Sequence, residues 1–251
     1  RFNFQAPFIT PFAIDPLVPR TLWAGTRAIE RSQDLGATWV QFSPTVQNEI
    51  NAIAIGKGAP NVIFGGTTAG FIFWTPNGGT NWFGGTAVQR PVTDIVGDPN
   101  DSRRFAITHG GFGPSKILIT ADAGTNFANL TGNLPDVPVN AFAFTPSRNR
   151  FFAGTDLGVF ETIDAGVSWS LTQGLPLVPV TDLVYHAASN RLVAGTYGRG
   201  IWTLPLITEP PILRGDVDRN GIVNAADALL IQRGLAAIQL PSPLTVMPHG
   251  D

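Results

Sequence analysis

Short segments of alternating hydrophobic and polar residues recur along most of the chain. Four of them are rich in β-branched residues and span 50–55, 92–96, 139–144 and 180–185. Alternation with a period of two is typical of β-strands, because successive side chains of a strand point to opposite faces of its sheet. A second kind of segment has small residues at its centre and ends in Thr, and its copies span 22–26, 63–67, 105–108, 152–155 and 193–196. Small central residues suit a strand that packs closely between neighbours, so the pattern predicts pairs of strands repeated along the chain.

An eight-residue pattern accompanies these strands in four copies. Its template is [Ser/Thr]-x-[Asp/Asn]-x-Gly-x-[Thr/Ser/Asn]-[Trp/Phe], and the copies start at Ser32, Thr75, Thr120 and Thr162, which lie 43, 45 and 42 residues apart. A period of about 40–45 residues with strand-rich content is the signature of propeller blades. We therefore predict an all-β propeller with four-stranded blades, each with an inner strand, a Gly-Thr strand, a third strand that enters the pattern and an outer strand. The predicted blades span about 4–45, 46–87, 88–134, 135–175 and 176–206.

The fifth predicted blade ends after Leu204 and contains no copy of the eight-residue pattern. A propeller commonly completes its last blade with a strand from the beginning of the chain, so we expect the missing outer strand to come from further upstream. The chain starts at Arg1 with neither Met nor a signal-like segment, which is typical of a processed product or a piece of a longer polypeptide. Five blades can close a ring, but the expectation is a larger one, of seven blades for example.

The polar residues that recur in the four copies of the pattern predict turn geometry rather than catalysis. In a tight hairpin an Asp or Asn accepts backbone N–H groups, Gly adopts a positive φ, and Thr or Ser bonds back to the main chain. The aromatic residue that ends the pattern is expected to pack against the neighbouring blade. A weak contact to an ion or a sugar is the alternative.

The four copies resemble the Asp-boxes, or BNR repeats, of the sialidase and sortilin superfamily of propellers. The similarity covers about 1–206 and is greatest to secreted bacterial BNR-repeat proteins, whose last blade has a Gly-Arg-Gly-aromatic ending that residues 197–202 resemble. It implies an exported bacterial protein, extracellular or at the cell surface. The superfamily includes sialidases, xyloglucanases, receptors and assembly factors, so the resemblance implies the fold and leaves the function open.

Residues for catalysis are few. The resemblance to sialidases would require an arginine triad, a Tyr nucleophile with a Glu partner and an Asp acid/base, but the chain contains only Tyr185 and Tyr197. A xyloglucanase-like enzyme would need two opposed carboxylates. Asp94 and Asp182 occupy equivalent positions on inner strands two blades apart, so both are expected to point toward the central channel. Polar residues at the mouth of a channel are the simpler interpretation, and the prediction leans toward a protein that is not an enzyme.

The pattern changes after a linker at 207–214, so we predict a propeller at 1–206 and a small module at 215–251. Apolar residues recur at helical spacing over 225–235. The preceding twelve residues match a Ca²⁺ loop, with oxygen ligands at the first, third, fifth, ninth and twelfth positions, a Gly at the sixth and a carbonyl at the seventh. The predicted ligands are Asp216, Asp218, Asn220, the carbonyl of Ile222, Asn224 and Asp227.

This loop and the helix after it resemble a type I dockerin repeat. Dockerins have two repeats, and a second one begins at 249–251, where the sequence stops. The resemblance implies docking to a cohesin-like protein or self-assembly. A metal-free, Asx-rich turn is the alternative.

Composition and charge exclude several classes of partner and of binding site. The formal net charge is −2, which leaves no basic footprint for nucleic acid, and no apolar run approaches the ~18 residues of a membrane span. Without Cys, disulfides and thiolate metal sites are excluded, and the three His lack metal-ligand spacing and are expected in loops or at edges. The predicted function is an exported, non-catalytic scaffold that binds protein or glycan. A glycoside hydrolase with part of its site in absent N-terminal blades, and a structural subunit of a surface layer or filament, are the alternatives.

Overall fold

A computed structural model describes residues 9–58, 61–86 and 88–206, together with Ala225 and Ala228. The chain divides into two compact units, residues 1–205 and residues 206–251. All six predicted Ca²⁺ ligands, and nearly all of the predicted helical module, lie outside the described residues. The fold described below is therefore that of the first unit.

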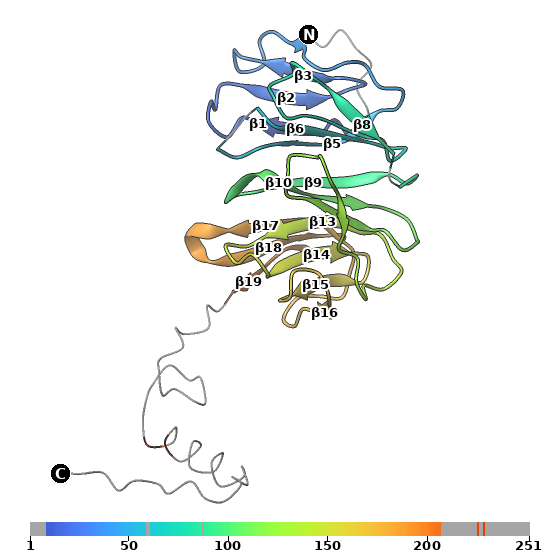
Figure 1. Ribbon diagram of the computed structural model, residues 1–251. Coiled ribbons are helices and arrows are strands. Elements are labelled where there is room, and N and C mark those ends of the chain that lie inside the picture. Colours follow the sequence, from blue (N-terminus) through green and yellow to red (C-terminus); the bar gives the residue numbers. More distant parts are fainter. Residues whose placement is uncertain (1–8, 59–60, 87, 207–224, 226–227, 229–251) are drawn as a thin grey trace, which may run out of the picture. The chain divides into compact units, whose positions relative to one another are not determined.

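The first unit consists of five antiparallel sheets that follow one another in chain order (Figure 1). The first two sheets contain β1 (Phe12–Ile14), β2 (Leu22–Gly25), β3 (Ile29–Ser32) and β4 (Val40–Gln41), then β5 (Ile50–Ile55), β6 (Ile63–Thr67), β7 (Ile72–Thr75) and β8 (Phe83–Gly85). The third and fourth contain β9 (Val92–Asp98), β10 (Asp101–His109), β11 (Ile117–Thr120) and β12 (Ala128–Asn129), then β13 (Val139–Phe144), β14 (Phe151–Thr155), β15 (Gly158–Thr162) and β16 (Ser170–Leu171). The fifth contains β17 (Val180–His186), β18 (Arg191–Thr196) and β19 (Gly200–Pro205), with a 3₁₀ turn at Ala187–Ser189.

Each sheet is a meander in which neighbours in sequence are neighbours in space. The first four sheets have four strands, and the fifth has three. This difference agrees with the missing fourth strand that the sequence pattern predicts for the last blade.

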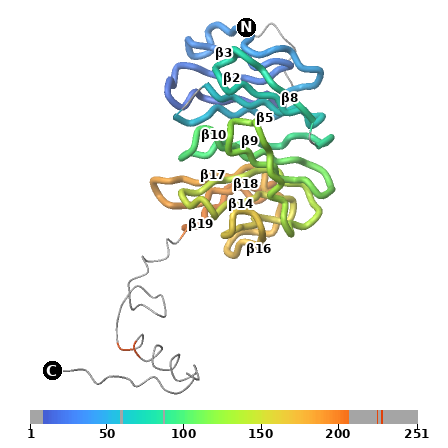
Figure 2. Tube along the Cα trace, viewed as in Figure 1, coloured from blue at the N-terminus to red at the C-terminus, as the bar shows by residue number. Residues whose placement is uncertain are grey.

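Successive sheets pack through their inner strands. β5 contacts β9, β9 contacts β13, and β13 contacts β17, while β1 and β2 both contact β5. Figure 2 shows the first three sheets one after another along the Cα trace, while the fourth and fifth overlap in this view. Within the described residues, β1 and β17 do not pack on each other in this way, so the two terminal sheets each have one neighbour.

The hydrophobic core lies between the sheets rather than in one central cluster. Trp23, Ile50 and Phe73 belong to the cluster between the first two sheets, and Phe64 and Phe105 belong to the next. The ring centroids of Phe64 and Phe105 lie 4.5 Å apart. Such apolar packing between consecutive sheets is the arrangement of propeller blades, and it confirms the predicted all-β propeller fold.

Candidate functional site

The four copies of the eight-residue pattern, called boxes below, form the turns between the third and fourth strands of the first four sheets. In the fourth copy, Thr162 Oγ1 donates to Asp164 Oδ1 (2.7 Å) and accepts from Gly166 N (2.9 Å). Asp164 Oδ1 also accepts from Ser168 N (2.9 Å). The other copies repeat these three bonds, with Asn77 in place of Asp in the second. The carboxylates thus close hairpins, as the sequence predicts.

The same hydrogen bonds fix the charge of these carboxylates. The pKa is lowered to about 2 in the three boxes that contain an Asp, at Asp34, Asp122 and Asp164. The main cause in each is hydrogen bonding from the residue four positions later, which is Thr38, Asn126 and Ser168 respectively. A carboxylate with such a low pKa is a poor proton donor or acceptor near neutral pH, which argues against acid/base catalysis at the boxes.

The aromatic residue at the end of each later box packs on the preceding sheet, as expected. Trp169 Nε1 donates to Leu130 O (2.9 Å), and the ring centroid of Phe127 lies 5.6 Å from that of Trp74. Trp82 lies 6.1 Å from Phe42 by the same measure. Among these aromatic residues Trp82 differs, because its indole N–H has no hydrogen-bond partner within the described residues.

Asp94 occupies the third position of β9, and the structure brings it near Asp182. Asp94 is half-buried, and its Oδ2 accepts a hydrogen bond from Phe142 N (3.1 Å) in the next sheet. The pKa of Asp94 is raised to about 7, mainly by burial, and the charge of Asp182 contributes in the same direction while the bond from Phe142 N opposes it. A carboxyl that is half protonated near pH 7 beside a second carboxyl resembles an acid/base pair, yet one oxygen of Asp94 already accepts a hydrogen bond from the fourth sheet.

The two Tyr residues do not form the nucleophile arrangement of a sialidase. Tyr185 donates its hydroxyl hydrogen bond to Asn190 Oδ1 (3.0 Å), next to the turn that links β17 and β18. Tyr197 lies in the β18–β19 hairpin and is 76% exposed. Within the described residues no group of three or more His, Cys, Asp or Glu side chains is placed to hold a metal ion.

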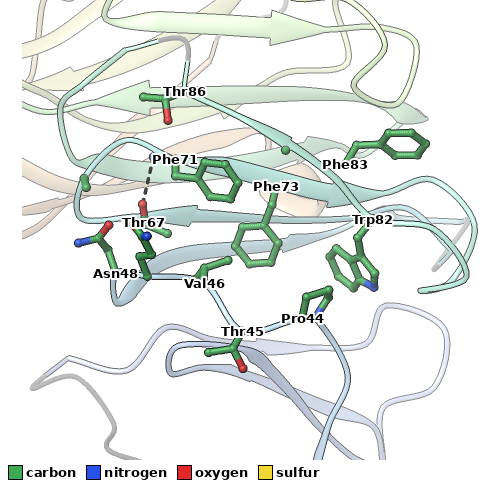
Figure 3. A pocket seen from close by; sticks show the side chains of 13 residues that line it. Pro44, Thr45, Val46, Asn48, Thr67, Phe71, Phe73, Trp82, Phe83 and Thr86 are labelled. Carbon is green, nitrogen blue, oxygen red and sulfur yellow. Dashed lines mark hydrogen bonds between the residues drawn. The ribbon is translucent and has the colours of Figure 1, made fainter.

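A groove beside the second sheet has a volume of about 510 Å³. Its floor is a row of aromatic rings, in which Phe71 and Phe73 have centroids 6.1 Å apart and Phe73 and Trp82 have centroids 5.7 Å apart. Figure 3 shows these rings on one side and Pro44, Thr45 and Val46 on the other. Phe73 is buried in the core, whereas Phe71 and Trp82 on either side of it are half-buried, so the groove presents parts of these two rings.

The opposite wall is the segment from Pro44 to Asn48, which enters β5. Val46 N donates to Arg27 O (2.7 Å), and the Arg27 guanidinium donates to Gln47 O, so this segment is held on the first sheet. The exposed side-chain amides of Gln47 and Asn48 have no hydrogen-bond partner within the described residues. They are free donors and acceptors at the rim of an aromatic groove.

Among the described residues, no charged side chain lines this groove. The polar lining residues that remain are Thr45, Thr67 and Thr86, and Thr67 Oγ1 already accepts from Phe71 N (3.0 Å). A concave, mainly apolar surface with a few polar groups is the ordinary form of a ligand site. The absence of charge favours a neutral ligand.

Sequence reasoning missed this groove, although it noted the Trp of the second box. The groove is built from residues 44–48, 67–73 and 82–86, which come together only when the second sheet packs beside the segment that precedes it. The available signal was the density of aromatic residues in 71–83, where Phe71, Phe73, Trp74, Trp82 and Phe83 occur within one hairpin.

No protein-family model matches the chain, and no curated protein matches it. Solved β-propellers are similar in fold. The Cps50 (Swd1) β-propeller domain of Myceliophteria thermophila has a TM-score of 0.65 at 14% identity, over 81% of this chain and 72% of that one. An ancestral GH74 enzyme has a TM-score of 0.63 at 18% identity, over 73% of this chain. A chain of a nidogen–laminin complex has a TM-score of 0.62 at 15% identity, over 80% of this chain and 77% of that one.

These similarities concern the fold alone, because all three identities are low. The chain spans 26% of the length of the GH74 enzyme. No helix within the described part of the chain is long and apolar enough to cross a membrane.

Proposed function

We propose that this chain is an exported, non-catalytic propeller scaffold that binds a neutral glycan in the groove between Phe71, Trp82 and the segment 44–48. The observation that carries the proposal is the composition of the groove: a row of aromatic rings, free amides at the rim and no charged residue. Secreted bacterial proteins with Asp-box repeats are the class that the sequence resembles, which supports the assignment.

The chemistry of the groove suits a sugar. Pyranose rings have an apolar C–H face that packs on aromatic side chains, and their hydroxyl groups exchange hydrogen bonds with amide and hydroxyl groups. Trp82 supplies both, since its ring lies in the groove and its indole N–H is without a partner. Asn48 and Gln47 supply the amide groups on the other wall. A protein ligand with a neutral, apolar segment is the second possibility for the same surface.

Trp82→Ala tests this function. We expect neutral oligosaccharides from plant and bacterial polysaccharides to quench the intrinsic tryptophan fluorescence of the chain, and the variant to bind at least tenfold more weakly, a loss of about 1.4 kcal/mol. Trp39→Ala is the matched control, because Trp39 is the equivalent box residue of the first sheet and is also half-buried. No binding by any oligosaccharide, or equal binding by both variants, would contradict the proposal.

A glycoside hydrolase is the second candidate function, and the raised pKa of Asp94 beside Asp182 favours it. The scaffold proposal expects no release of reducing ends from the same oligosaccharides. Turnover that Asp94→Asn or Asp182→Asn abolishes would favour the hydrolase instead.

For the second unit we propose a dockerin-like Ca²⁺ site, supported by the spacing of the oxygen ligands between Asp216 and Asp227. It would attach the scaffold to a protein partner or to its own neighbours. Isothermal titration calorimetry with Ca²⁺ should show one binding event that Asp216→Ala weakens strongly, while Asp156→Ala, outside the loop, leaves it unchanged. A titration without heat, or a titration that Asp216→Ala does not alter, refutes the assignment.

A further inference from the structure

A second groove, called groove 2 below, lies where the second sheet meets the third and has a volume of about 530 Å³. Its residues Trp74 and Phe127 pack on the apolar cluster between these two sheets. The groove described above, called groove 1, contains Phe71 and Trp82, which pack on the cluster between the first and second sheets. Successive side chains of a strand point to opposite faces of its sheet. The second sheet therefore has one groove on each face.

Groove 2 has the same chemical character as groove 1. The ring of Trp74 stacks on that of Phe83, with centroids 6.1 Å apart and planes inclined by 26°, and meets the ring of Phe127 edge-on at 5.6 Å. Phe83 is 51% exposed, and Trp74 and Phe127 are half-buried. Among the described residues no charged side chain lines groove 2, and none bonds to Trp74 Nε1. Both grooves thus offer aromatic rings and an indole N–H to a neutral ligand.

The strand β8 separates the two grooves. Phe83 lines both of them, whereas Gly84 lines groove 1 and Gly85 lines groove 2. β8 is the last strand of its sheet, and all three of its residues are exposed. Because two of these residues have no side chain, the ridge between the grooves is bare backbone over most of the strand. A ligand that fills one groove can therefore continue into the other across this ridge.

Packing explains one of these two glycines but not the other. A Cβ atom on Gly84 would lie 2.5 Å from Cζ of Phe71, so the ring in groove 1 requires a glycine there. A Cβ atom on Gly85 would meet nothing within 4 Å, and Gly85 does not have a positive φ. Glycine weakens a strand, and the outer strands β4, β12 and β16 contain none. A low passage between the grooves is a reason for glycine at this position.

We propose that the ligand is a long, linear, neutral polysaccharide, which occupies groove 1, crosses β8 at Gly85 and packs further sugar rings on Trp74 and Phe127 in groove 2. This inference rests on the proposed function, because it extends the glycan site of groove 1. A chain of pyranose rings repeats the same apolar face and the same hydroxyl groups at regular intervals. Two uncharged aromatic grooves on either side of one low strand match that repetition.

The length of the ligand is the property that separates this inference from a site for a small sugar. A sugar that fills only groove 1 gains nothing from further rings, so its affinity would not change as the chain is lengthened. A chain that reaches groove 2 makes a second set of contacts without losing its translational and rotational freedom a second time. Its affinity should therefore rise steeply at the length that spans β8.

Isothermal titration calorimetry with cello-, xylo-, manno- and malto-oligosaccharides, from disaccharide to hexasaccharide, tests the inference. We expect a series that binds to gain at least tenfold in affinity between its shortest and longest members. Gly85→Val raises the ridge without a steric conflict, so it should remove this gain and leave the binding of the shortest members unchanged. Ser170→Val is the matched control, because Ser170 is exposed on β16, the outer strand of the fourth sheet.

A second variant, Phe127→Leu, keeps an apolar side chain but removes a ring from groove 2, so it should also reduce the gain with length. Binding that Trp82→Ala weakens but that does not strengthen with length would overturn the inference and leave the proposed function standing. A gain with length that Gly85→Val and Phe127→Leu both leave intact would do the same. No binding by any member of the four series would overturn the inference as well, and the proposed function would fail with it only if the wider set of oligosaccharides also gave no binding.

Discussion

At the scale of single residues, Asp94 joins the third sheet to the fourth, and its contribution to the stability of the fold depends on pH. Its pKa is raised from 3.8 to about 7 by burial, so the folded state binds the proton more tightly than the unfolded state. The resulting stabilisation is complete below about pH 4 and is lost as the pH rises toward 7. Ionised Asp94 keeps its bond from Phe142 N but is poorly solvated.

Asp94→Asn isolates this effect. The amide oxygen can still accept from Phe142 N, and the side chain carries no charge at any pH. We expect the variant to resemble the wild type in urea unfolding at pH 4 and to be more stable at pH 8, by roughly 1–2 kcal/mol, since one pKa unit corresponds to about 1.4 kcal/mol. A stability difference that is the same at both pH values would contradict the assigned cause.

His109 is the residue that sequence reasoning placed least well. It was expected in a loop or at an edge, but it is fully buried at the end of β10, and neither ring nitrogen has a hydrogen-bond partner. Burial lowers its pKa to about 4. In the other sheets a Thr stands here, and Thr155, for example, donates to Gly158 O (2.9 Å). The repeat pattern aligned Thr108 with this position, but the strand pairing places His109 there, because His109 pairs with Val92 as Thr155 pairs with Val139.

At the scale of elements, the hairpin of the eight-residue pattern is the unit whose structure could be predicted most fully from the sequence. Its hydroxyl, carboxylate and glycine positions could all be assigned roles from local turn chemistry, because every bond lies within eight residues. One feature was not expected. The residue before the box Gly also has a positive φ, at 59° for Leu35 and 61° for Ala165. Only the second box has Gly at this position, with φ of 67° at Gly78.

Thr162→Val tests the hairpin as an element. The Thr162 hydroxyl is buried and bonds both Asp164 and Gly166 N, so its loss leaves a buried N–H without a partner. We expect the free energy of unfolding to fall by about 1–3 kcal/mol in urea denaturation.

Asp164→Asn is the matched control for that measurement. Asn77 fills the same role in the second box, so this variant should fold with a small change at neutral pH. If Thr162→Val and Asp164→Asn lost the same stability, the assigned contribution of the Thr162 hydroxyl to the hairpin would be wrong. On acidification the Asp164→Asn variant should lose less stability than the wild type. In the wild type the lowered pKa of Asp164 means that the ionised side chain stabilises the fold above about pH 4, and this stabilisation is lost as the pH falls toward 2.

At the scale of the whole molecule, the repeat period predicted the order of the sheets and the incomplete fifth blade. The groove and the contact between Asp94 and Phe142 could not be predicted, because each depends on how two sheets pack. The groove joins residues 44–48 to 67–86 across a sheet boundary. From the sequence, Asp94 was predicted to point toward the central channel. Only the structure shows that its carboxylate accepts a hydrogen bond from Phe142 N.

The terminal sheets have a consequence for how the molecule comes apart. Within the described residues, the inner strands β5, β9 and β13 each contact inner strands on two sides, whereas β17 contacts β13 and β1 contacts β5. Local opening costs least where fewest contacts break, so the first and fifth sheets are the regions where proteases would cut earliest and where backbone amides would exchange fastest.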